Sequence, residues 1–240
     1  MDLFISVEDD SLIPQAQIIS KQTGLPIKKE DGFCLFLKHD GLYLKDDRLS
    51  FKVDFRDHLY RIAHLQNEKL LKVAKTRNED PLCLDLTAGL GEDSFLLAAG
   101  GYRVILYEKN PVIAALLKDG MKRGMNDNDL GEILKRMTLI CGDSIELSKD
   151  HERKADLVYL DPMFPKKNKS SLVNKRLQLL QKLEEPCKDE EELLAAALDA
   201  SVSKVIIKRP LKGPFLAGRK PDYSSFGKAI RYDCILVRHK

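Results

Sequence analysis

The fold of this chain is decided by the stretch Leu82-Cys83-Leu84-Asp85-Leu86-Thr87-Ala88-Gly89-Leu90-Gly91. Its first five residues are mostly apolar and predict a buried strand, and the two glycines allow a tight turn after it. Residues 93–99 then predict a helix that Gly100-Gly101 would end. A strand, a glycine turn and a helix in this order are typical of an α/β fold, in which ligands bind beyond the carboxyl ends of the strands.

The same alternation continues along the rest of the chain. Further strands are expected at 103–108, 137–141, 155–160, 204–208 and 231–237. Helices are expected at 111–123, 132–136, 172–183 and 190–201. Alternating strands and helices predict a mainly parallel sheet that is covered on both faces. Because no helical pattern separates the last two strands, the final strand is expected to be antiparallel.

The residues before the glycine turn predict a smaller unit. Residues 1–56 read as an α+β extension with a strand at 3–7, a helix at 15–22, a hairpin around His39-Asp40-Gly41 and a strand at 48–54. Residues 57–80 predict a linker of one or two helices, and residues 81–240 predict the main domain. The extension carries no recognisable catalytic motif.

Composition restricts the class of protein. The 240 residues are 43% hydrophobic and 32% charged, which is typical of a globular chain. Apolar runs fall far short of the ~20 residues of a membrane span, and the N-terminus lacks the basic region of a signal peptide. Neither the five cysteines nor the five histidines show metal-ligand spacing. A cytoplasmic protein without a metal is therefore expected.

The positive charge of the chain is unevenly distributed. The formal net charge is +3, yet residues 161–240 contain 17 basic and 10 acidic side chains. Such an excess favours an anionic partner on that side of the molecule, although a solvated lysine-rich face would give the same count.

The glycine turn favours a cationic ligand over a dinucleotide. Gly89 and Gly91 would let the backbone approach a ligand, but Ser94 stands where dinucleotide sites have a third glycine. Glu92 and Asp93 would repel a pyrophosphate. The same carboxylates suit the ammonium and sulfonium groups of S-adenosylmethionine (SAM).

Carboxylates follow four of the expected strands, at Asp85, Glu108, Asp143 and Asp161. A single acid in this place is often a helix cap, but four at one edge of a sheet indicate a ligand site. Glu108 would accept the ribose hydroxyls of the methyl donor, and Asp143 would accept its adenine amine.

The last of these acids lies in the segment Asp161-Pro162-Met163-Phe164, which resembles the (Asp/Asn)-Pro-Pro-(Tyr/Phe) motif of methyltransferases that act on planar nitrogens. Asp161 would accept the N–H bonds of an aryl amine and localise its lone pair. Pro162 would fix the turn, Phe164 would stack on the base, and catalysis would be largely positioning. A structural Asp-Pro turn is the alternative. The basic residues expected to contact an RNA backbone include Lys166, Lys167, Lys169, Lys208 and Arg209.

Four segments together resemble the bacterial ribosomal RNA small subunit methyltransferase J family. They are residues 85–91, Glu108-Lys109-Asn110-Pro111-Val112, residues 159–165 and Val205-Ile206-Ile207-Lys208-Arg209-Pro210. The resemblance covers about residues 55–237. It implies a Rossmann-like class I SAM-dependent fold, with a seven-stranded, mainly parallel sheet whose last strand is antiparallel. It also implies methylation of a guanine N2 in 16S ribosomal RNA, free or in the small subunit.

The resemblance also implies donor contacts from Glu92-Asp93, Glu108-Lys109, Asp143-Ser144 and Asp161. The chain departs from the family at Ala63-His64-Leu65-Gln66, where a run of glycines is usual. The alternatives are methylation of adenine N6 or of a protein glutamine, or a non-catalytic RNA-binding or ribosome-assembly factor with the same fold.

Overall fold

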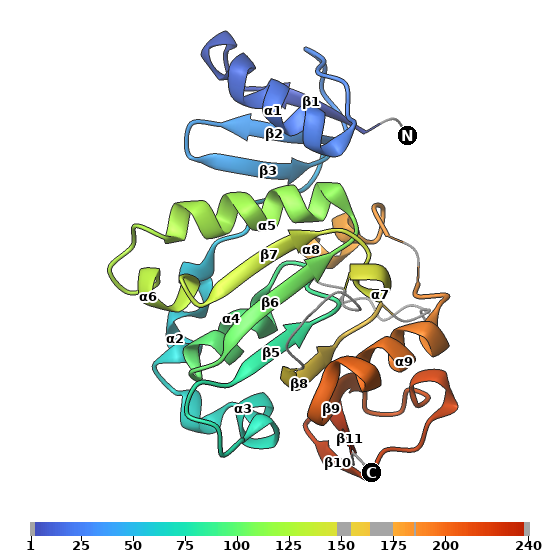
Figure 1. Ribbon diagram of the computed structural model, residues 1–240. Helices are drawn as coiled ribbons and strands as arrows, with labels where there is room; N and C mark the ends of the chain where they lie inside the picture. Colours follow the sequence, from blue (N-terminus) through green and yellow to red (C-terminus); the bar gives the residue numbers. More distant parts are fainter. Residues whose placement is uncertain (1–2, 148–154, 164–174, 185, 238–240) are drawn as a thin grey trace.

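A computed structural model describes residues 3–147, 155–163, 175–184 and 186–237. Its main unit is a seven-stranded sheet in the order β10-β11-β9-β8-β5-β6-β7 (Figure 1). The strands are β5 (Leu82–Asp85), β6 (Arg103–Glu108), β7 (Met137–Cys141), β8 (Ala155–Leu160), β9 (Ser201–Pro210), β10 (Tyr223–Phe226) and β11 (Ile230–Leu236). The pairs from β7 to β9 are parallel, whereas β11 is antiparallel to both β9 and β10. The predicted mainly parallel sheet and antiparallel last strand are confirmed.

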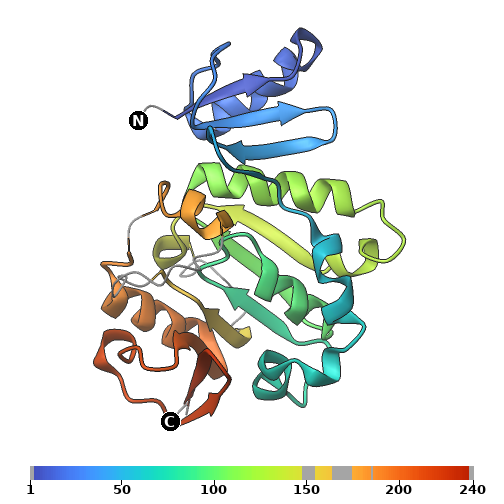
Figure 2. The same ribbon diagram turned by 180° about the vertical axis from the view of Figure 1, so that it is seen from behind.

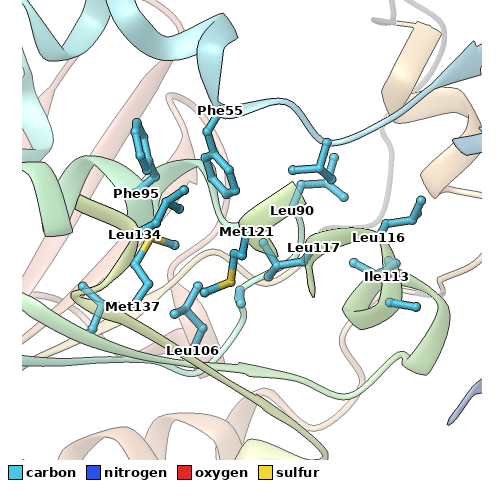
Figure 3. Packing of buried hydrophobic residues seen from close by; sticks show 14 of the residues in the cluster. Phe55, Leu90, Phe95, Leu106, Ile113, Leu116, Leu117, Met121, Leu134 and Met137 are labelled. Atoms are coloured by element: carbon cyan, nitrogen blue, oxygen red, sulfur yellow. The ribbon is translucent and has the colours of Figure 1, made fainter. Parts of the chain in front are cut away.

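The helices of this unit are α4 (Glu92–Ala99), α5 (Pro111–Gly124), α6 (Gly131–Leu134), α7 (Ser144–Leu147), α8 (Lys175–Leu180) and α9 (Glu190–Ala200). Successive residues of a strand point to opposite faces of the sheet. Cys83 accordingly joins one hydrophobic cluster with α4 and α5, while Leu82 and Leu84 join a second cluster with α9. The fully apolar strand segments seen in the sequence are explained by these two covered faces. Figure 3 shows the first cluster, in which Phe95 lies near Phe55 and Leu106 near Met121.

Residues 3–51 form a separate four-stranded sheet with the order β1-β2-β3-β4. Its elements are β1 (Phe4–Val7), η1 (Asp10–Leu12), α1 (Ile13–Thr23), β2 (Cys34–Lys38), β3 (Gly41–Lys45) and β4 (Ser50–Phe51). The helix ends at Gly24, whose φ of 73° is the left-handed conformation expected at a helix end. The predicted hairpin is confirmed by the antiparallel β2–β3 pair.

This small sheet lies against α5 in both views of the molecule (Figures 1 and 2). The backbone N–H of Leu42 donates a hydrogen bond of 3.0 Å to Asp119 of α5. Gly120 allows the chain that follows β4 to pass close to α5, because a Cβ there would lie 2.6 Å from Val53. One hydrophobic cluster includes residues of both units, so the division at residue 56 does not separate two cores.

The segment that joins the two units, where one or two helices were expected, holds two short α-helices and two 3-10 turns. It contains four short pieces, η2 (Phe55–His58), α2 (Leu59–Ile62), η3 (Leu65–Asn67) and α3 (Lys69–Ala74). Glu68 has an extended backbone conformation between the last two. Its carboxylate accepts two hydrogen bonds of 2.8 Å from Arg61, which fold the segment back on itself.

Three other elements differ from the sequence prediction. The strand β10 was not expected, because Tyr223-Ser224-Ser225-Phe226 is short, polar in the middle and largely exposed. The short helix α7 was not expected either, and β9 is longer than the predicted 204–208. Within the described residues, no helix is long and apolar enough to cross a membrane, and no cluster of His, Cys, Asp and Glu could hold a metal ion.

Candidate active site

A cavity of about 790 Å³ lies beyond the carboxyl ends of the central strands. The predicted site residues that line it are Asp85, Gly89, Glu92, Asp93, Glu108, Lys109, Asp143, Ser144, Asp161, Pro162 and Lys208. Gly91 and Arg209 are not part of its lining. Phe164, Lys166, Lys167 and Lys169 lie outside the described residues. The acidic strand ends therefore share one cavity, as is usual for ligand sites of α/β sheets.

Asp85 is almost completely buried beneath the glycine turn. One carboxylate oxygen accepts a hydrogen bond of 2.6 Å from the Ser94 hydroxyl, and the other accepts one of 3.0 Å from the backbone N–H of Thr87. Burial raises the pKa of Asp85 to about 7, although these two hydrogen bonds act to lower it. Asp85 thus ties the turn to the first turn of α4, and Ser94 serves as its partner where a glycine would offer none.

Glu108 ends β6 and holds the two loops that border the cavity. Its two carboxylate oxygens accept backbone N–H bonds from Gly89, at 2.8 Å, and from Asn110, at 2.7 Å. Burial, together with the nearby carboxyl of Glu184, raises the pKa of Glu108 to about 8. No sequence pattern indicated that Glu184 would lie here, because it follows α8 and reaches Glu108 only through the tertiary fold.

The two glycines of the turn have different surroundings. Gly89 has φ +53°, and a Cβ at this position would meet no atom of the described residues within 4 Å. Gly91 has φ +75°, and its Cβ would lie 2.8 Å from a methyl group of Leu117 in the core. Of the two glycines, only Gly89 lines the cavity, whereas the missing Cβ of Gly91 leaves room for Leu117 of α5. A ligand contact from Gly91 stays a prediction.

The residues after β6 and β7 lie at the border of the cavity. Lys109 and Asp143 are exposed, while Ser144 is buried. Asp143 accepts a hydrogen bond of 2.9 Å from the backbone N–H of Ile145, at the start of α7. One oxygen of Asp143 thus acts as a helix cap, which is the structural role that a single acid after a strand often has.

The turn after β8 is tied to the glycine turn. The backbone N–H of Asp161 donates a hydrogen bond of 2.6 Å to the Thr87 hydroxyl. The Pro162 residue is buried, and the carbonyl oxygen of Met163 accepts a hydrogen bond of 3.1 Å from the N–H of Cys187. The Asp-Pro turn is therefore held at both ends by loops that also line the cavity.

Asp93 and Asp161 are joined by Lys208 from the neighbouring strand β9. The Lys208 Nζ lies 2.7 Å from Asp93 Oδ2 and 2.8 Å from Asp161 Oδ2. The Tyr159 hydroxyl donates a further hydrogen bond of 2.6 Å to Asp93 Oδ2. Glu92 lies at the same end of α4 and forms an ion pair of 3.2 Å with Arg176. Both acids of the Glu92-Asp93 pair thus have cationic partners from the protein itself.

Arg209 points to the opposite face of β9 from Lys208 and is completely buried. Its Nε donates a hydrogen bond of 2.7 Å to the carbonyl oxygen of Pro214, and its guanidinium lies 3.6 Å from Glu190. A contact of Arg209 with RNA would require this side chain to leave the interior. The expectation that Arg209 binds RNA is therefore replaced by a structural role.

Comparison with known proteins agrees with this geometry. A family model described as "Putative SAM-dependent methyltransferase" matches residues 18–237. The ribosomal RNA small subunit methyltransferase J of Pseudomonas paraeruginosa is 47% identical over 226 residues, which are 89% of this chain and 87% of the relative. This chain belongs to the ribosomal RNA small subunit methyltransferase J family. The resemblance inferred from the four motifs is confirmed, and the enzyme class is that of SAM-dependent methyltransferases.

Other members of the methyltransferase J family and a solved structure support the same assignment. The methyltransferase J of Pseudomonas syringae pv. tomato is 40% identical over 227 residues, covering 89% of this chain and 84% of the relative. The crystal structure of a SAM-dependent methyltransferase from Neisseria gonorrhoeae superposes with a TM-score of 0.77 at 29% identity. It covers 97% of this chain and 95% of that chain, so the similarity includes the N-terminal extension.

The segment in which this methyltransferase J chain lacks the expected glycines runs from the end of α2 into η3. The Nδ1–H of His64 donates a hydrogen bond of 2.8 Å to the carbonyl oxygen of Tyr60, and the centroids of the two rings lie 4.5 Å apart. Tyr60 is 77% exposed. The substituted segment therefore contributes the half-buried ring of His64, which packs beside the exposed ring of Tyr60, where glycines would leave only backbone.

Proposed function

We propose that this member of the methyltransferase J family transfers a methyl group from SAM to the exocyclic N2 of a guanine in 16S ribosomal RNA. The single observation that carries the proposal is the position of the Asp161 carboxylate. It follows the strand next to Asp85 and opens into the cavity that Glu108 and Asp143 border. The names of the relatives, which refer to the RNA of the small subunit, favour this substrate class.

The chemistry of the cavity fits the methyl donor. Glu108 and Asp143 are acceptors suited to the ribose hydroxyls and the adenine amine, and Gly89 leaves open space beside them. Lys109 and Ser144 would complete the donor contacts. SAM, when bound, supplies an electrophilic methyl group. The two carboxylates of Asp93 and Asp161, with the one ammonium of Lys208, leave a net charge of −1 that suits a cationic donor.

The role of Asp161 toward the acceptor follows from its chemistry. The lone pair of a guanine amine is delocalised into the ring and is a weak nucleophile. A carboxylate that accepts the amine N–H bonds localises this lone pair and orients it, so that catalysis consists mostly of positioning. Pro162 keeps the turn rigid, and Phe164 would stack on the base.

The proposed RNA contacts lie on the C-terminal third of the chain. Lys166, Lys167 and Lys169 follow the Asp161 turn, and each phosphate that they contact would make binding dependent on salt. Lys212, Arg219, Lys220 and Lys228 are exposed and suit the same surface. A substrate of this kind implies a cytoplasmic location.

The function is tested by incubating 16S ribosomal RNA, or small subunits that lack the modification, with SAM labelled in its methyl group. Label should appear in N2-methylguanosine after nucleoside digestion, and Asp161→Ala should abolish transfer while S-adenosylhomocysteine still binds. Label in N6-methyladenosine or in glutamine would establish one of the alternative acceptors. Full biological function in the Asp161→Ala variant would instead indicate a non-catalytic assembly factor.

A further inference from the structure

Lys208 stands between two carboxylates from different parts of the cavity. Asp93 belongs to the first turn of α4, on the donor side, and Asp161 belongs to the turn after β8, on the acceptor side. The Lys208 Nζ is within 2.8 Å of an oxygen of each. Its side chain is only 25% exposed, so it forms part of the cavity wall and is poorly placed for the surface RNA contact that the sequence suggested.

The two ion pairs of Lys208 with Asp93 and Asp161, called the bridge below, occupy only one oxygen of Asp161. Lys208 holds Oδ2, and in the described part of the chain no donor lies within hydrogen-bond distance of Oδ1. The side chain of Asp161 is 35% exposed and lines the cavity. One oxygen is thus fixed by the protein, and the other can accept an N–H group from a molecule in the cavity.

We propose that Lys208 is a positioning residue of the methyl transfer, which keeps Asp161 ionised and directs its Oδ1 to the planar amine of the acceptor base. This inference rests on the function proposed above. A protonated Asp161 could present a donor where the amine also presents donors, and it would no longer localise the lone pair. Lys208 would therefore act on the reaction through Asp161, without itself touching the reacting atoms.

The electrostatics of the site support this role. Burial raises the pKa of Asp161, and the Asp93 carboxylate raises it further, while the Lys208 ammonium acts in the opposite direction. An opposite charge at this distance lowers a carboxyl pKa by about 1–3 units. Removing Lys208 would leave two buried carboxylates beside each other, and such a pair favours protonation of one member.

Other charged and titratable groups surround the bridge on every side. They are Asp85 of β5, Tyr159 of β8, Arg209 of β9, Tyr232 of β11 and Arg61 of α2. Among them, only Tyr159 forms a direct hydrogen bond with the bridged carboxylates in the described residues. Lys208 is the cation in contact with both acids, so its removal should have the largest effect on the pKa of Asp161.

The test compares Lys208→Met, Lys208→Gln and Lys208→Arg in the full-length protein. Lys204→Met is the matched control, because Lys204 lies four residues earlier on the same strand and its Nζ donates a hydrogen bond of 2.7 Å to the Val73 carbonyl, away from Asp93 and Asp161. The Asp161 pKa is measured by NMR with aspartate labelled at the carboxyl carbon, and Asp161→Asn assigns the signal. The kcat and the KM for RNA are measured over a range of pH.

In Lys208→Met and Lys208→Gln, the Asp161 pKa should rise by about 1–3 pH units. At neutral pH, kcat should fall by about tenfold or more and recover as the pH is raised, whereas KM for RNA stays within about twofold. Lys208→Arg should retain most of kcat and the pH profile, and Lys204→Met should match the wild type. The two neutral substitutions differ in shape, so one suffices if the other does not fold.

An unchanged Asp161 pKa in folded Lys208→Met or Lys208→Gln would overturn the inference. A raised KM for RNA with an unchanged kcat profile would also overturn it, and would restore the RNA-contact interpretation. The NMR titration needs no RNA and no methyl transfer. If the wild type transfers no label, the proposed function fails, while the bridge itself is still tested by the titration.

Discussion

The Thr87 hydroxyl accepts a hydrogen bond of 2.6 Å from the backbone N–H of Asp161, and this bond joins the glycine turn directly to the acidic turn. Thr87→Val keeps the shape of the side chain but removes the acceptor. We expect a loss of about 1–3 kcal/mol in stability, because a partly buried N–H is left without a partner. We also expect kcat to fall by about 10- to 100-fold through misplacement of Asp161. Thr87→Ser should retain both, and an unaffected kcat in folded Thr87→Val would contradict the coupling of the two turns.

Gly89 and Gly91 offer a matched pair of substitutions. Both have positive φ, so alanine strains the backbone at either position by about 1 kcal/mol or more. Gly91→Ala also places a Cβ 2.8 Å from Leu117 and should be the less stable variant in chemical denaturation. In Gly89→Ala, the new methyl group meets no atom of the described part of the chain within 4 Å, so this variant should mainly weaken S-adenosylhomocysteine binding, as measured by calorimetry. Equal stabilities with equal affinities would refute the distinction.

The raised pKa of Glu108 predicts a pH-dependent stability of the ligand-free protein. Its folded-state pKa is about 8 against an ordinary 4.5, so the folded state holds this proton more tightly than the unfolded state does. Stability should therefore decrease as the pH rises from about 4.5 to about 8. Asp85, whose pKa is raised to about 7, should lower the stability in the same way, but its contribution ends at a lower pH than that of Glu108.

Urea titrations across this range would measure the effect. Glu108→Gln should flatten the slope most clearly near pH 8, where the contribution of Asp85 has become small. Glu132→Gln is the control, since Glu132 is exposed on α6 and pairs with Lys135 at the surface. A slope in Glu108→Gln that matches the wild type would show that another group titrates in this window.

The burial of Arg209 separates this structural arginine from the lysines that are proposed to contact RNA. Arg209→Met should destabilise the fold by about 1–3 kcal/mol, because Glu190 and the Pro214 carbonyl lose their partner. It should leave the salt dependence of RNA binding unchanged. Lys166→Ala or Lys167→Ala should lower RNA affinity and reduce the slope against log salt by about 1. A reduced slope in Arg209→Met would mean that this side chain reaches the RNA.

Much of the fold could be predicted because local pattern and tertiary environment agree. The apolar run 82–86, the turn glycines and the Pro111 helix start all reappear in β5, Gly89 and α5. The strand β10 could not be predicted, since its four residues are paired only on one side and remain largely exposed. Its pairing depends on β11, which follows it in the chain.

The site was predictable in its location more than in its contacts. A sequence shows that acids follow successive strands, and parallel strands bring those ends to one edge. It does not show that Lys208 faces the cavity and Arg209 the interior, since adjacent residues of a strand point in opposite directions and the register sets which is which. Likewise, Thr87 and Tyr159 were within the quoted motifs, but only the pairing of β5 with β8 brings their partners within reach.

The position of β11 between β9 and β10 has a consequence for synthesis. The strand that carries Lys208 keeps an uncovered edge until residues 230–236 have left the ribosome, because its neighbour on that side is made last. Unpaired edges recruit other strands and promote aggregation. A chain that stopped before Ile230 would thus expose the edge beside Asp93 and Asp161. Premature termination should yield insoluble or rapidly degraded chains, with little accumulation of a folded form that binds RNA without modifying it.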